Sequence, residues 1–475
     1  MRKTKIICTL GPSVDDTDIM KELILSGMDV ARFNFSHADH EEHHGRLIKI
    51  RKLSKELGIP IATLLDTKGP EIRIGTFKDD RKIELVAGQS FTLTSRDIEG
   101  DETQVSISYK ELVQDVEIGS TILIDDGLVE LKVTALTATD ITCCVNNNGV
   151  ISNRKGVNVP GTHLSMPFIS SKDREDIIFG IENHYDFIAA SFVSTAADVL
   201  EIREIIKTHN SPVKIIAKIE NFHGVEHIDE IIEASDGIMI ARGDMGVEIP
   251  YEDVPSIQKM IIKKVYNAGK QVITATQMLD SMMKNPRPTR AEATDVANAI
   301  YDGTSAIMLS GETAAGAYPI ESVKTMVKIA LRTEDDIDYK KRFRMLDACQ
   351  STNITDAISR ATVTTAHDLD AKMIITVTTS GNTARMISRY RPQCEILCCT
   401  TDPVVYRQLK MAWGVTPLLM AIEHDTFELF DHAMQVVIDA GFLLPGELAV
   451  LTAGVPLGMA GTTNLLKVQV ASNKK

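Results

Sequence analysis

The chain repeats a pattern of short apolar, β-branched runs, most of them followed by a helix-like stretch. Eight such runs lie in the first two thirds of the sequence: Lys5–Leu10, Val30–Phe35, Ile61–Asp66, Phe187–Phe192, Lys214–Ile219, Gly237–Ile240, Gln271–Ala275 and Ala306–Leu309. Strands that alternate with helices are typical of parallel βαβ units, and eight such units favour a closed (β/α)8 TIM barrel over an open sheet. Polar residues follow these runs, at the end of the barrel where this fold places its active site.

The regular spacing breaks between the third and fourth runs. The segment Glu71–Met166 is rich in Thr, Val, Ile, Asp and Gly, and it contains hairpin signals at Asp125–Gly127 and Asn147–Gly149. We therefore expect an all-β domain inserted into one barrel loop, above the active-site face, where it can act as a lid.

The last third of the chain shows a third pattern. Five strand-like runs alternate there with helical segments: Met373–Val377, Ile396–Cys399, Val415–Leu419, Leu448–Leu451 and Leu466–Val470. They predict a separate open α/β domain. A charged stretch at 332–350 precedes them and is either a domain boundary or the solvated face of a helix.

These patterns together predict an α/β protein with three domains. The expected bounds are 1–70 and 167–345 for the catalytic barrel, 71–166 for a β-barrel-like lid, and 346–475 for a C-terminal regulatory domain.

The composition of the chain limits the kinds of partner that we expect it to bind. A formal net charge of −14 opposes binding to nucleic acid or anionic lipid. The apolar runs are far shorter than the roughly 18 residues that span a bilayer, so we expect no membrane segment. The first residues, MRKTKIICTLGP, lack the features of a secretory signal, and the seven cysteines form no paired zinc pattern. We expect a cytoplasmic enzyme with reduced thiols and small-molecule partners.

The fifth and sixth runs carry the strongest chemical signal. They end in AKIEN (Ala217–Asn221) and MIARGDMGVEIP (Met239–Pro250). Lys218 and Glu220 share one face of a strand, because side chains alternate with period two. Glu220 and Asp244 offer hard oxygen ligands to Mg²⁺, and Lys218 can neutralise a phosphoryl group in transfer. A Lys-x-Glu pair alone is more typical of a structural ion pair, but its place at a barrel end favours catalysis.

Glycines and hydroxyl groups extend this ring. Gly243 and Gly246 flank Asp244, so the backbone can turn sharply and present N–H groups to an anion. Without its context this GDxG sequence would indicate only a turn. Three further polar residues follow the seventh and eighth runs: Thr276, Ser310 and Glu312.

The second and third runs end in RFNFSH (Arg32–His37) and LLDTKGPEIR (Leu64–Arg73). They supply oxygen donors suited to a weakly held monovalent cation: Asn34, Ser36, Asp66 and Thr67. The alternative is that these residues cap helices and form turns, for which the same residue types are preferred.

Long motifs in a fixed order identify a family. They are RFNFSH, LDTKGPEIR, AKIEN, ARGDMGVEIP, ATQML (Ala275–Leu279), NPRPTRAE (Asn285–Glu292) and IMLSGETAAGAYP (Ile307–Pro319). Through them the chain resembles the pyruvate kinase family over nearly its whole length. The resemblance implies a phosphotransferase that moves the phosphoryl group of phosphoenolpyruvate to ADP, giving ATP and pyruvate, the final step of glycolysis. It also implies Mg²⁺ (or Mn²⁺) and K⁺ as cofactors. The sequence departs from many relatives at Phe33 and Ala38, where those often have Met and Gly.

The resemblance also implies roles for the central residues. Arg32 contacts the substrate phosphate, Lys218 stabilises the phosphoryl group in transfer, and Glu220 with Asp244 binds the divalent ion. The amides of Gly243 and Asp244, with the Thr276 hydroxyl, hold the substrate carboxylate.

Further roles follow from the same resemblance. Arg73 and Lys172 serve nucleotide or lid-side phosphate contacts, and Ser310 with Glu312 belongs to the proton or water network near the product enolate. The implied potassium ligands are Asn34, Ser36, Asp66 and Thr67.

The sequence TTSGNTAR (Thr378–Arg385) follows an expected strand and opens a helix, which predicts a phosphate cradle. It resembles the family's effector loop, whose positions are here Thr378, Thr379, Ser380, Gly381, Asn382 and Thr383. The Gly-rich segment Thr452–Asn464 is its expected companion, and either segment alone could be only a tight turn. The family resemblance implies a phosphorylated allosteric effector and a homotetramer.

Glu71, in the sequence GPEIR between barrel and lid, bears on the potassium requirement. Relatives with Glu at this position generally need K⁺ and those with Lys generally do not; the alternative is a simple hinge ion pair.

Two other classes of protein are alternatives: a different metal-dependent barrel enzyme acting on phosphoenolpyruvate or pyruvate enolates, and an inactive metabolite sensor. The β insertion argues against the first. Intact Lys218, Glu220, Asp244 and Thr276 argue against the second.

Overall fold

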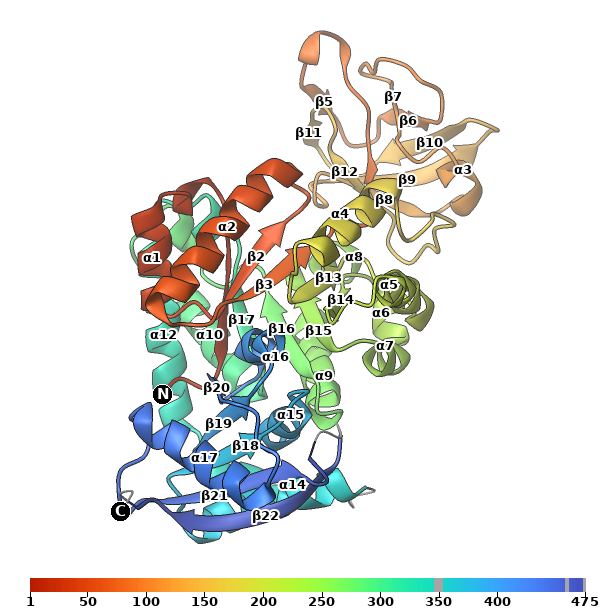
Figure 1. Ribbon diagram of the computed structural model, residues 1–475. Helices are drawn as coiled ribbons and strands as arrows, with labels where there is room; N and C mark the ends of the chain where they lie inside the picture. Colours follow the sequence, from red (N-terminus) through yellow and green to blue (C-terminus); the bar gives the residue numbers. More distant parts are fainter. Residues whose placement is uncertain (346–352, 458–460, 473–475) are drawn as a thin grey trace.

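The computed structural model describes residues 1–345, 353–457 and 461–472. Its centre is a closed barrel of eight parallel strands in the order β1-β17-β16-β15-β14-β13-β3-β2 (Figure 1). Their bounds are β1 Lys5–Thr9, β2 Val30–Asn34, β3 Ala62–Asp66, β13 Phe187–Ala190, β14 Lys214–Ile219, β15 Gly237–Ala241, β16 Gln271–Ala275 and β17 Ala306–Leu309. The predicted TIM barrel is confirmed, with each expected run in its own strand.

Helices cover the outside of the barrel. They are α1 Thr17–Ser26, α2 His40–Leu57, α4 Ser171–Glu182, α5 Ala196–Thr208, α6 Phe222–Glu226, α7 Ile228–Ala234, α8 Arg242–Glu248, α9 Val254–Asn267, α10 Arg290–Asp302, α11 Gly311–Ala314 and α12 Pro319–Asp336. Local sequence sets their ends. The Asp39 carboxylate accepts the Glu42 amide at 3.0 Å where α2 begins, and Gly58, with φ of 65°, ends that helix.

The expected β insertion forms a body that projects from one end of the barrel, drawn in orange to yellow in Figure 1. A seven-stranded sheet has the order β4-β12-β8-β9-β10-β6-β7, and β11 pairs with β5 in a second, two-stranded sheet. The bounds are β4 Ile72–Arg73, β5 Ile83–Leu85, β6 Ser90–Thr94, β7 Gln104–Ser106, β8 Thr121–Ile124, β9 Val129–Leu136, β10 Asp140–Val145, β11 Gly149–Ile151 and β12 Gly156–Asn158, with one short helix, α3 Leu112–Asp115.

One of the two predicted hairpins is confirmed and the other is wrong. Asp125–Gly127 joins the antiparallel pair β8 and β9. Asn147–Gly149 instead leads from β10 into β11, which pairs with β5. The side chain of Asn147 explains the difference, because its Oδ1 accepts the Glu130 amide at 2.8 Å and its Nδ2 donates to the Leu128 carbonyl at 2.8 Å. These bonds hold the turn against β9.

The last third contains an open five-stranded sheet in the order β20-β19-β18-β21-β22, in which only β22 is antiparallel to its neighbour. This confirms the open α/β architecture expected there. The bounds are β18 Met373–Val377, β19 Glu395–Thr400, β20 Val415–Leu419, β21 Leu448–Gly454 and β22 Thr463–Val470, with helices α14 Ile354–Asp368, α15 Asn382–Arg389, α16 Pro403–Gln408 and α17 Thr426–Asp439.

The charged stretch before this sheet is helical as far as the structure describes it. Residues 332–336 end α12, and a short helix follows, α13 Tyr339–Met345. Phe343 of α13 packs into the apolar cluster of the last sheet. Residues 346–350 of the stretch lie outside the described residues, and the domain boundaries stay a prediction.

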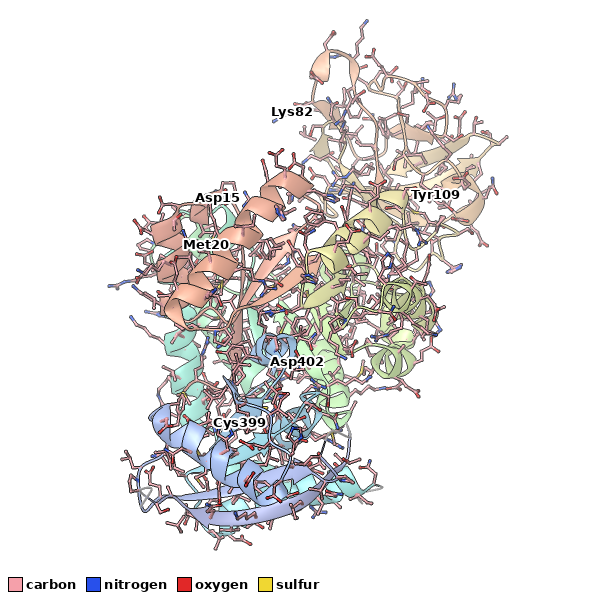
Figure 2. All side chains as sticks on the ribbon, in the orientation of Figure 1. Asp15, Met20, Lys82, Tyr109, Cys399 and Asp402 are labelled. Carbon is pink, nitrogen blue, oxygen red and sulfur yellow. The ribbon has the colours of Figure 1, made fainter. Side chains whose placement is uncertain are left out.

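Thiols and membrane segments can be judged for most of the chain. Six cysteines are free and four of them are buried, among them Cys399 in the last sheet (Figure 2), whereas Cys349 lies outside the described residues.

In the ranges that the structure describes, no helix combines the length and apolar character needed to cross a membrane.

A methionine of the last third packs into the barrel. Met411, in the turn after α16, is fully buried in one cluster with Ile7, Val30 and Leu64 of the barrel strands. Beside it, Arg407 pairs with the buried Asp186 at 2.9 Å. The base of the barrel is thus closed by residues from another part of the chain.

We expect Met411→Ala to lower the free energy of unfolding by about 2–5 kcal/mol, because a fully buried side chain leaves a cavity where two parts of the chain meet. Urea denaturation of the full chain measures the change. The matched control is Met345→Ala, at a residue that is 71% exposed, and it should change stability by less than about 0.5 kcal/mol. Equal effects of both variants would contradict the packing role of Met411.

Candidate active site

A lysine and two carboxylates meet at the carboxyl end of the barrel. The Lys218 Nζ atom lies 3.0 Å from Asp66 Oδ1 and 2.9 Å from Glu220 Oε1, and it donates to Ser191 Oγ at 2.7 Å. Lys218 is 8% exposed, whereas Asp66 and Glu220 are each 1% exposed. Strands β3 and β14 therefore bring together the charged residues that the sequence placed at their ends.

Arg32 joins this group from β2. Its Nε atom donates to Asp66 Oδ2 at 2.6 Å, and its Nη1 atom donates to Thr9 Oγ1 at 2.9 Å. The Asp66 carboxylate thus uses one oxygen for Arg32 and the other for Lys218. We call Asp66, Arg32, Lys218 and Glu220 the charged centre.

Burial and charge act in opposite directions on these groups. Burial raises the pKa of Glu220 to about 7, the nearby charge of Asp244 adds to the rise, and Lys218 opposes it. Burial alone would lower the pKa of Lys218, but the Asp66 and Glu220 carboxylates raise it above its usual value. Burial would raise the pKa of Asp66, yet Arg32 and Lys218 lower it. The two cations therefore keep Asp66 ionised, while Glu220 lacks full compensation.

Asp244 lies in the first turn of α8 and is exposed. The preceding amide, that of Gly243, donates to Thr276 Oγ1 at 2.8 Å, which ties α8 to the end of β16. Thr276 has φ of 66°, a conformation unfavourable for a β-branched residue. Arg242 Nη2 also donates to the Thr276 carbonyl at 2.7 Å. These contacts hold an amide and a hydroxyl group together at the barrel mouth.

Ser310 and Glu312 follow β17, as expected. The Glu312 carboxylate accepts the Leu279 amide at 3.0 Å and the Ser310 amide at 2.8 Å, so it joins the loops after β16 and β17. Burial raises the pKa of Glu312. The Ser310 hydroxyl is buried and has no hydrogen-bond partner among the described residues.

The four expected donors to a monovalent ion lie at the ends of β2 and β3. Asn34 Oδ1 accepts the Ser36 amide at 3.1 Å, which is the turn contact considered as the alternative for this segment. Thr67 Oγ1 accepts the Ser191 amide at 3.2 Å, and Asp66 belongs to the charged centre. The donors are adjacent, but part of their hydrogen-bonding capacity is used by the protein.

The described residues contain no group of three or more His, Cys, Asp and Glu side chains arranged to hold a metal ion. Glu220, in the charged centre, and the exposed Asp244 are the two carboxylates that the sequence suggested as ligands of a divalent ion. This donor set fits Mg²⁺, which usually takes one or two protein carboxylates and fills its other positions with water or substrate oxygens. The incomplete compensation of Glu220 by positive charge also fits a cation.

A cleft of about 340 Å³ separates the lid from the barrel mouth. Asp126 and His163 line it from the lid, and Phe192 and Asp244 line it from the barrel. Asn158 Nδ2 of the lid donates to Glu248 Oε1 of α8 at 2.8 Å across the same gap. A ligand in this cleft would contact both bodies.

Two residues of the site were not predicted: Thr9, which accepts from Arg32, and Ser191, which accepts from Lys218. Thr9 is the last residue of β1 and Ser191 directly follows β13. The rule that found the other residues, polar groups at the ends of barrel strands, would have found these two as well.

Comparison with known proteins places this site in a family. A family model described as "Pyruvate kinase, barrel domain" matches residues 1–323, and one described as "Pyruvate kinase, alpha/beta domain" matches residues 356–469. The chain belongs to the pyruvate kinase family. Pyruvate kinase of Geobacillus stearothermophilus is 51% identical over 99% of this chain and 81% of its own length, and that of Clostridium acetobutylicum is 51% identical over 99% and 100%. A crystal structure of a pyruvate kinase from Cryptosporidium parvum has a TM-score of 0.94 and 43% identity, covering 99% of this chain and 96% of its own. The predicted family is confirmed. The predicted function is confirmed as well, because these relatives are named pyruvate kinase.

Two residues for which family membership suggests phosphate contacts lie outside the charged centre. Lys172 Nζ donates to Asp176 Oδ2 at 2.8 Å and to the Phe35 carbonyl at 3.4 Å. Arg73 Nη1 donates to the Arg154 carbonyl at 2.7 Å, and its Nη2 pairs with Glu71.

Glu71 lies between two cations, because Lys68 Nζ is 3.3 Å from its Oε2 atom and Arg73 is its other partner. Glu71 therefore forms the hinge ion pair that is the alternative to a role in the potassium requirement. Ala38 has φ of 64°, a conformation that favours glycine, the residue that the family resemblance led us to expect at this position.

The expected effector loop has the predicted strand–loop–helix form between β18 and α15. Gly381, with φ of 77°, donates its amide to Thr378 Oγ1 at 3.1 Å, and the Ser380 hydroxyl accepts the Asn382 amide at 3.4 Å. Thr383 is buried, and its hydroxyl contacts Thr463 Oγ1 at 2.7 Å. That contact links the loop to its expected companion segment, of which residues 458–460 lie outside the described residues.

We expect Asp66→Asn to lower the free energy of unfolding by about 3–5 kcal/mol, because Arg32 and Lys218 lose a shared buried counter-charge. Urea denaturation without substrate or metal measures this effect separately from catalysis. The control is Asp140→Asn in the lid, whose partner Arg96 is half exposed, and it should cost less than about 1 kcal/mol. A loss as small as that of the control would show that Asp66 does not stabilise the charged centre.

Proposed function

We propose that this chain transfers the phosphoryl group of phosphoenolpyruvate to ADP, with Mg²⁺ (or Mn²⁺) and K⁺ as cofactors. The observation that carries the proposal is the charged centre under the lid. It offers two buried cations to a phosphate and keeps carboxylates beside them for a metal ion. Catalysis of this kind depends mainly on positioning and electrostatic stabilisation.

Arg32 and Lys218 are proposed to bind the reacting phosphate. Both side chains are fixed by Asp66, and Lys218 is further fixed by Ser191 and Glu220, so their positions are set before substrate arrives. Preorganised donors stabilise charge that develops in the transition state without a cost of rearrangement. We assign Arg32 to the substrate phosphate and Lys218 to the group in transfer.

The substrate carboxylate is assigned to α8 and the end of β16. The amides of Gly243 and Asp244 and the Thr276 hydroxyl are the proposed hydrogen-bond donors to that carboxylate. The bond from the Gly243 amide to Thr276 Oγ1 supports this assignment, because it places two of the three groups side by side, and the substrate would replace it.

The metal ligands follow from the donor types. Glu220 and Asp244 would hold Mg²⁺, which would supply positive charge to the phosphate and enolate oxygens. Asn34, Ser36, Asp66 and Thr67 would hold K⁺. Arg73 and Lys172 are assigned to the nucleotide phosphates, and Ser310 with Glu312 to the outer part of the network that delivers a proton to the enolate carbon.

The test of the reaction is a coupled assay with phosphoenolpyruvate, ADP, Mg²⁺ and K⁺ that follows pyruvate and ATP together. Equal amounts of both products support the proposal. Pyruvate without ATP would indicate a different enzyme of phosphoenolpyruvate. Effector binding without turnover would indicate a metabolite sensor.

The setting of this activity is also a proposal. We infer a cytoplasmic homotetramer that works in glycolysis and responds to a phosphorylated effector at Thr378–Thr383. The support is the family, the open strand–loop–helix turn and the cysteines, which are free in the described residues.

We expect Lys218→Met to reduce turnover by roughly 10²–10³-fold or more, because one preorganised charge interaction with the transition state is lost. The coupled assay measures the change, and circular dichroism checks the fold. Lys214→Met is the control at the opposite end of the same strand, and it should keep near-normal turnover. Near-normal turnover of Lys218→Met would reject the assigned role.

We expect a phosphorylated sugar or nucleotide to lower the half-saturating phosphoenolpyruvate concentration, and Ser380→Ala and Thr383→Ala to weaken that effect by removing loop hydroxyl groups. Fructose bisphosphate, ribose phosphate and AMP should be compared. Ser256→Ala, an exposed serine on α9, is the control that should leave activation intact. Activation unchanged in both loop variants would move the effector site elsewhere.

We expect strong K⁺ activation of the natural protein and weaker K⁺ dependence in Glu71→Lys, with some loss of maximal rate. A Lys ammonium near the site can replace part of the charge that K⁺ supplies. Assays should replace K⁺ by a tetraalkylammonium ion at constant ionic strength. Glu84→Lys, exposed on the lid, makes the same change in net charge and should keep the K⁺ dependence. Full activity of the natural protein without K⁺, Na⁺ or NH₄⁺ would refute the proposed potassium role.

A further inference from the structure

A small cavity with cationic walls lies between the base of the barrel and the last third of the chain. Its lining includes Tyr266, Lys270, Ser305, Arg385, Arg389 and Arg391. None of the described residues that line it is acidic. It is separate from the barrel mouth, because these residues belong to or follow α9, precede β17, or belong to α15 and the turn after it.

Arg391 is the central cation of this cavity. Its side chain lies between two aromatic rings, with the Cζ atom 4.5 Å from the Trp413 centroid and 5.3 Å from that of Tyr266. The Nη2 atom donates to the Gly303 carbonyl at 3.0 Å and to Ser305 Oγ at 3.1 Å. The Nε and Nη1 atoms are buried and have no hydrogen-bond partner among the residues that the structure describes, and Arg391 is only 4% exposed.

The other cationic side chains of the cavity do not bring a carboxylate to Arg391. Arg389 pairs with Asp356 at 2.9 Å. Arg385 is in no ion pair in the described part of the chain, and its Nη2 atom donates to the Ser380 carbonyl at 3.0 Å. Lys270 Nζ donates to three backbone carbonyls, at 2.5–2.8 Å.

A buried guanidinium without a counter-charge is costly. Burial lowers the pKa of Arg391 to about 9, and the positive charge of Arg342 contributes to the shift. The contact with two ring faces recovers part of the lost hydration but supplies no acceptor for Nε or Nη1. An anion would satisfy both needs, and guanidinium groups bind phosphate oxygens well.

We propose that this cavity binds an oxyanion of the phosphate class, either inorganic phosphate or the phosphate group of a larger molecule, at Arg391 and Arg385. The interior measures only about 10 Å³, room for one water-sized group. The ligand therefore enters with a single oxygen, and a sugar ring or a base stays outside.

The cavity lies between the helix that follows the expected effector loop and a strand of the barrel. Arg385 and Arg389 belong to α15, which starts at the expected effector loop, and Arg385 also donates to Ser380 within that loop. On the other side, Ser305 directly precedes β17, whose far end carries Ser310. An anion here joins the effector loop's helix to a barrel strand, so it should stabilise the contact between the two bodies.

The first test compares melting of the full-length protein in inorganic phosphate and in chloride at equal ionic strength. We expect phosphate to raise Tm by about 2 °C or more. Arg391→Met keeps the volume between the two rings and removes the donors, so most of the rise should be lost. The control Arg407→Met removes an arginine from the same interface that already has a carboxylate, Asp186, and it should keep the rise.

Two outcomes would overturn the proposal: no rise in the natural protein, or an equal rise in Arg391→Met. A purely structural role of Arg391 predicts the second outcome, because the cost of the substitution would then be the same in both buffers. Arg385→Gln is the second variant if Arg391→Met does not fold, and it should also reduce the rise.

A crystal of the natural protein soaked in tungstate locates the anion directly. We expect anomalous density within hydrogen-bonding distance of Arg391 or Arg385. Density only at the barrel mouth or at Thr378–Thr383, or water alone beside Arg391, would contradict the assignment. None of these outcomes depends on phosphoryl transfer, so failure here is distinguishable from failure of the proposed function.

To tell inorganic phosphate from a larger phosphorylated ligand, the melting series is repeated with ribose phosphate at the same concentration. If ribose phosphate raises Tm more than inorganic phosphate does in the Ser380→Ala variant, and adding Arg391→Met removes that larger rise, the cavity is assigned to a phosphorylated metabolite. A rise equal to that of inorganic phosphate assigns it to the free ion.

Discussion

The shared carboxylate of Asp66 is the interaction on which the site depends. One of its oxygens binds Arg32 and the other binds Lys218, and all three side chains are largely buried. Arg32 and Asp66 lie on the paired strands β2 and β3, and Lys218 lies on β14, two strands further along the barrel, so these atoms meet only once the parallel sheet has formed. Removing charge from water is costly, so the cluster is stable only while its members remain paired. The barrel therefore fixes both the geometry of the site and its charge balance.

The lid and the last third of the chain contact opposite ends of the barrel. The lid covers the mouth and contacts α8 through Asn158 and Glu248, while the last third closes the base through Met411 and the Asp186–Arg407 pair. The barrel strands run from the base to the mouth and therefore lie between these two contacts.

The sequence predicts the strands well because their signal is local. Each barrel strand is a short apolar run, and its polar last residues fall at the mouth, which is why Lys218, Glu220 and Asp244 could be placed at one mouth, whereas the pairing of Asp66 with Arg32 and Lys218 was not predicted. Asn147–Gly149 failed as a hairpin because β11, which follows it, pairs with β5, a strand distant in the sequence, and no local pattern shows this. The partners of Arg391 come from α9, from the loop before β17 and from the turn before β20, so that cavity was also beyond sequence reasoning.

In the function proposed above, the charged centre holds the divalent ion and the substrate phosphate side by side, so that each favours binding of the other. The direct measurement is Mn²⁺ binding to the full-length protein by electron paramagnetic resonance, with and without phosphoenolpyruvate. We expect phosphoenolpyruvate to tighten Mn²⁺ binding about 5-fold or more, and Mn²⁺ to tighten phosphoenolpyruvate binding by the same factor. The same Mn²⁺ affinity with and without phosphoenolpyruvate would contradict it.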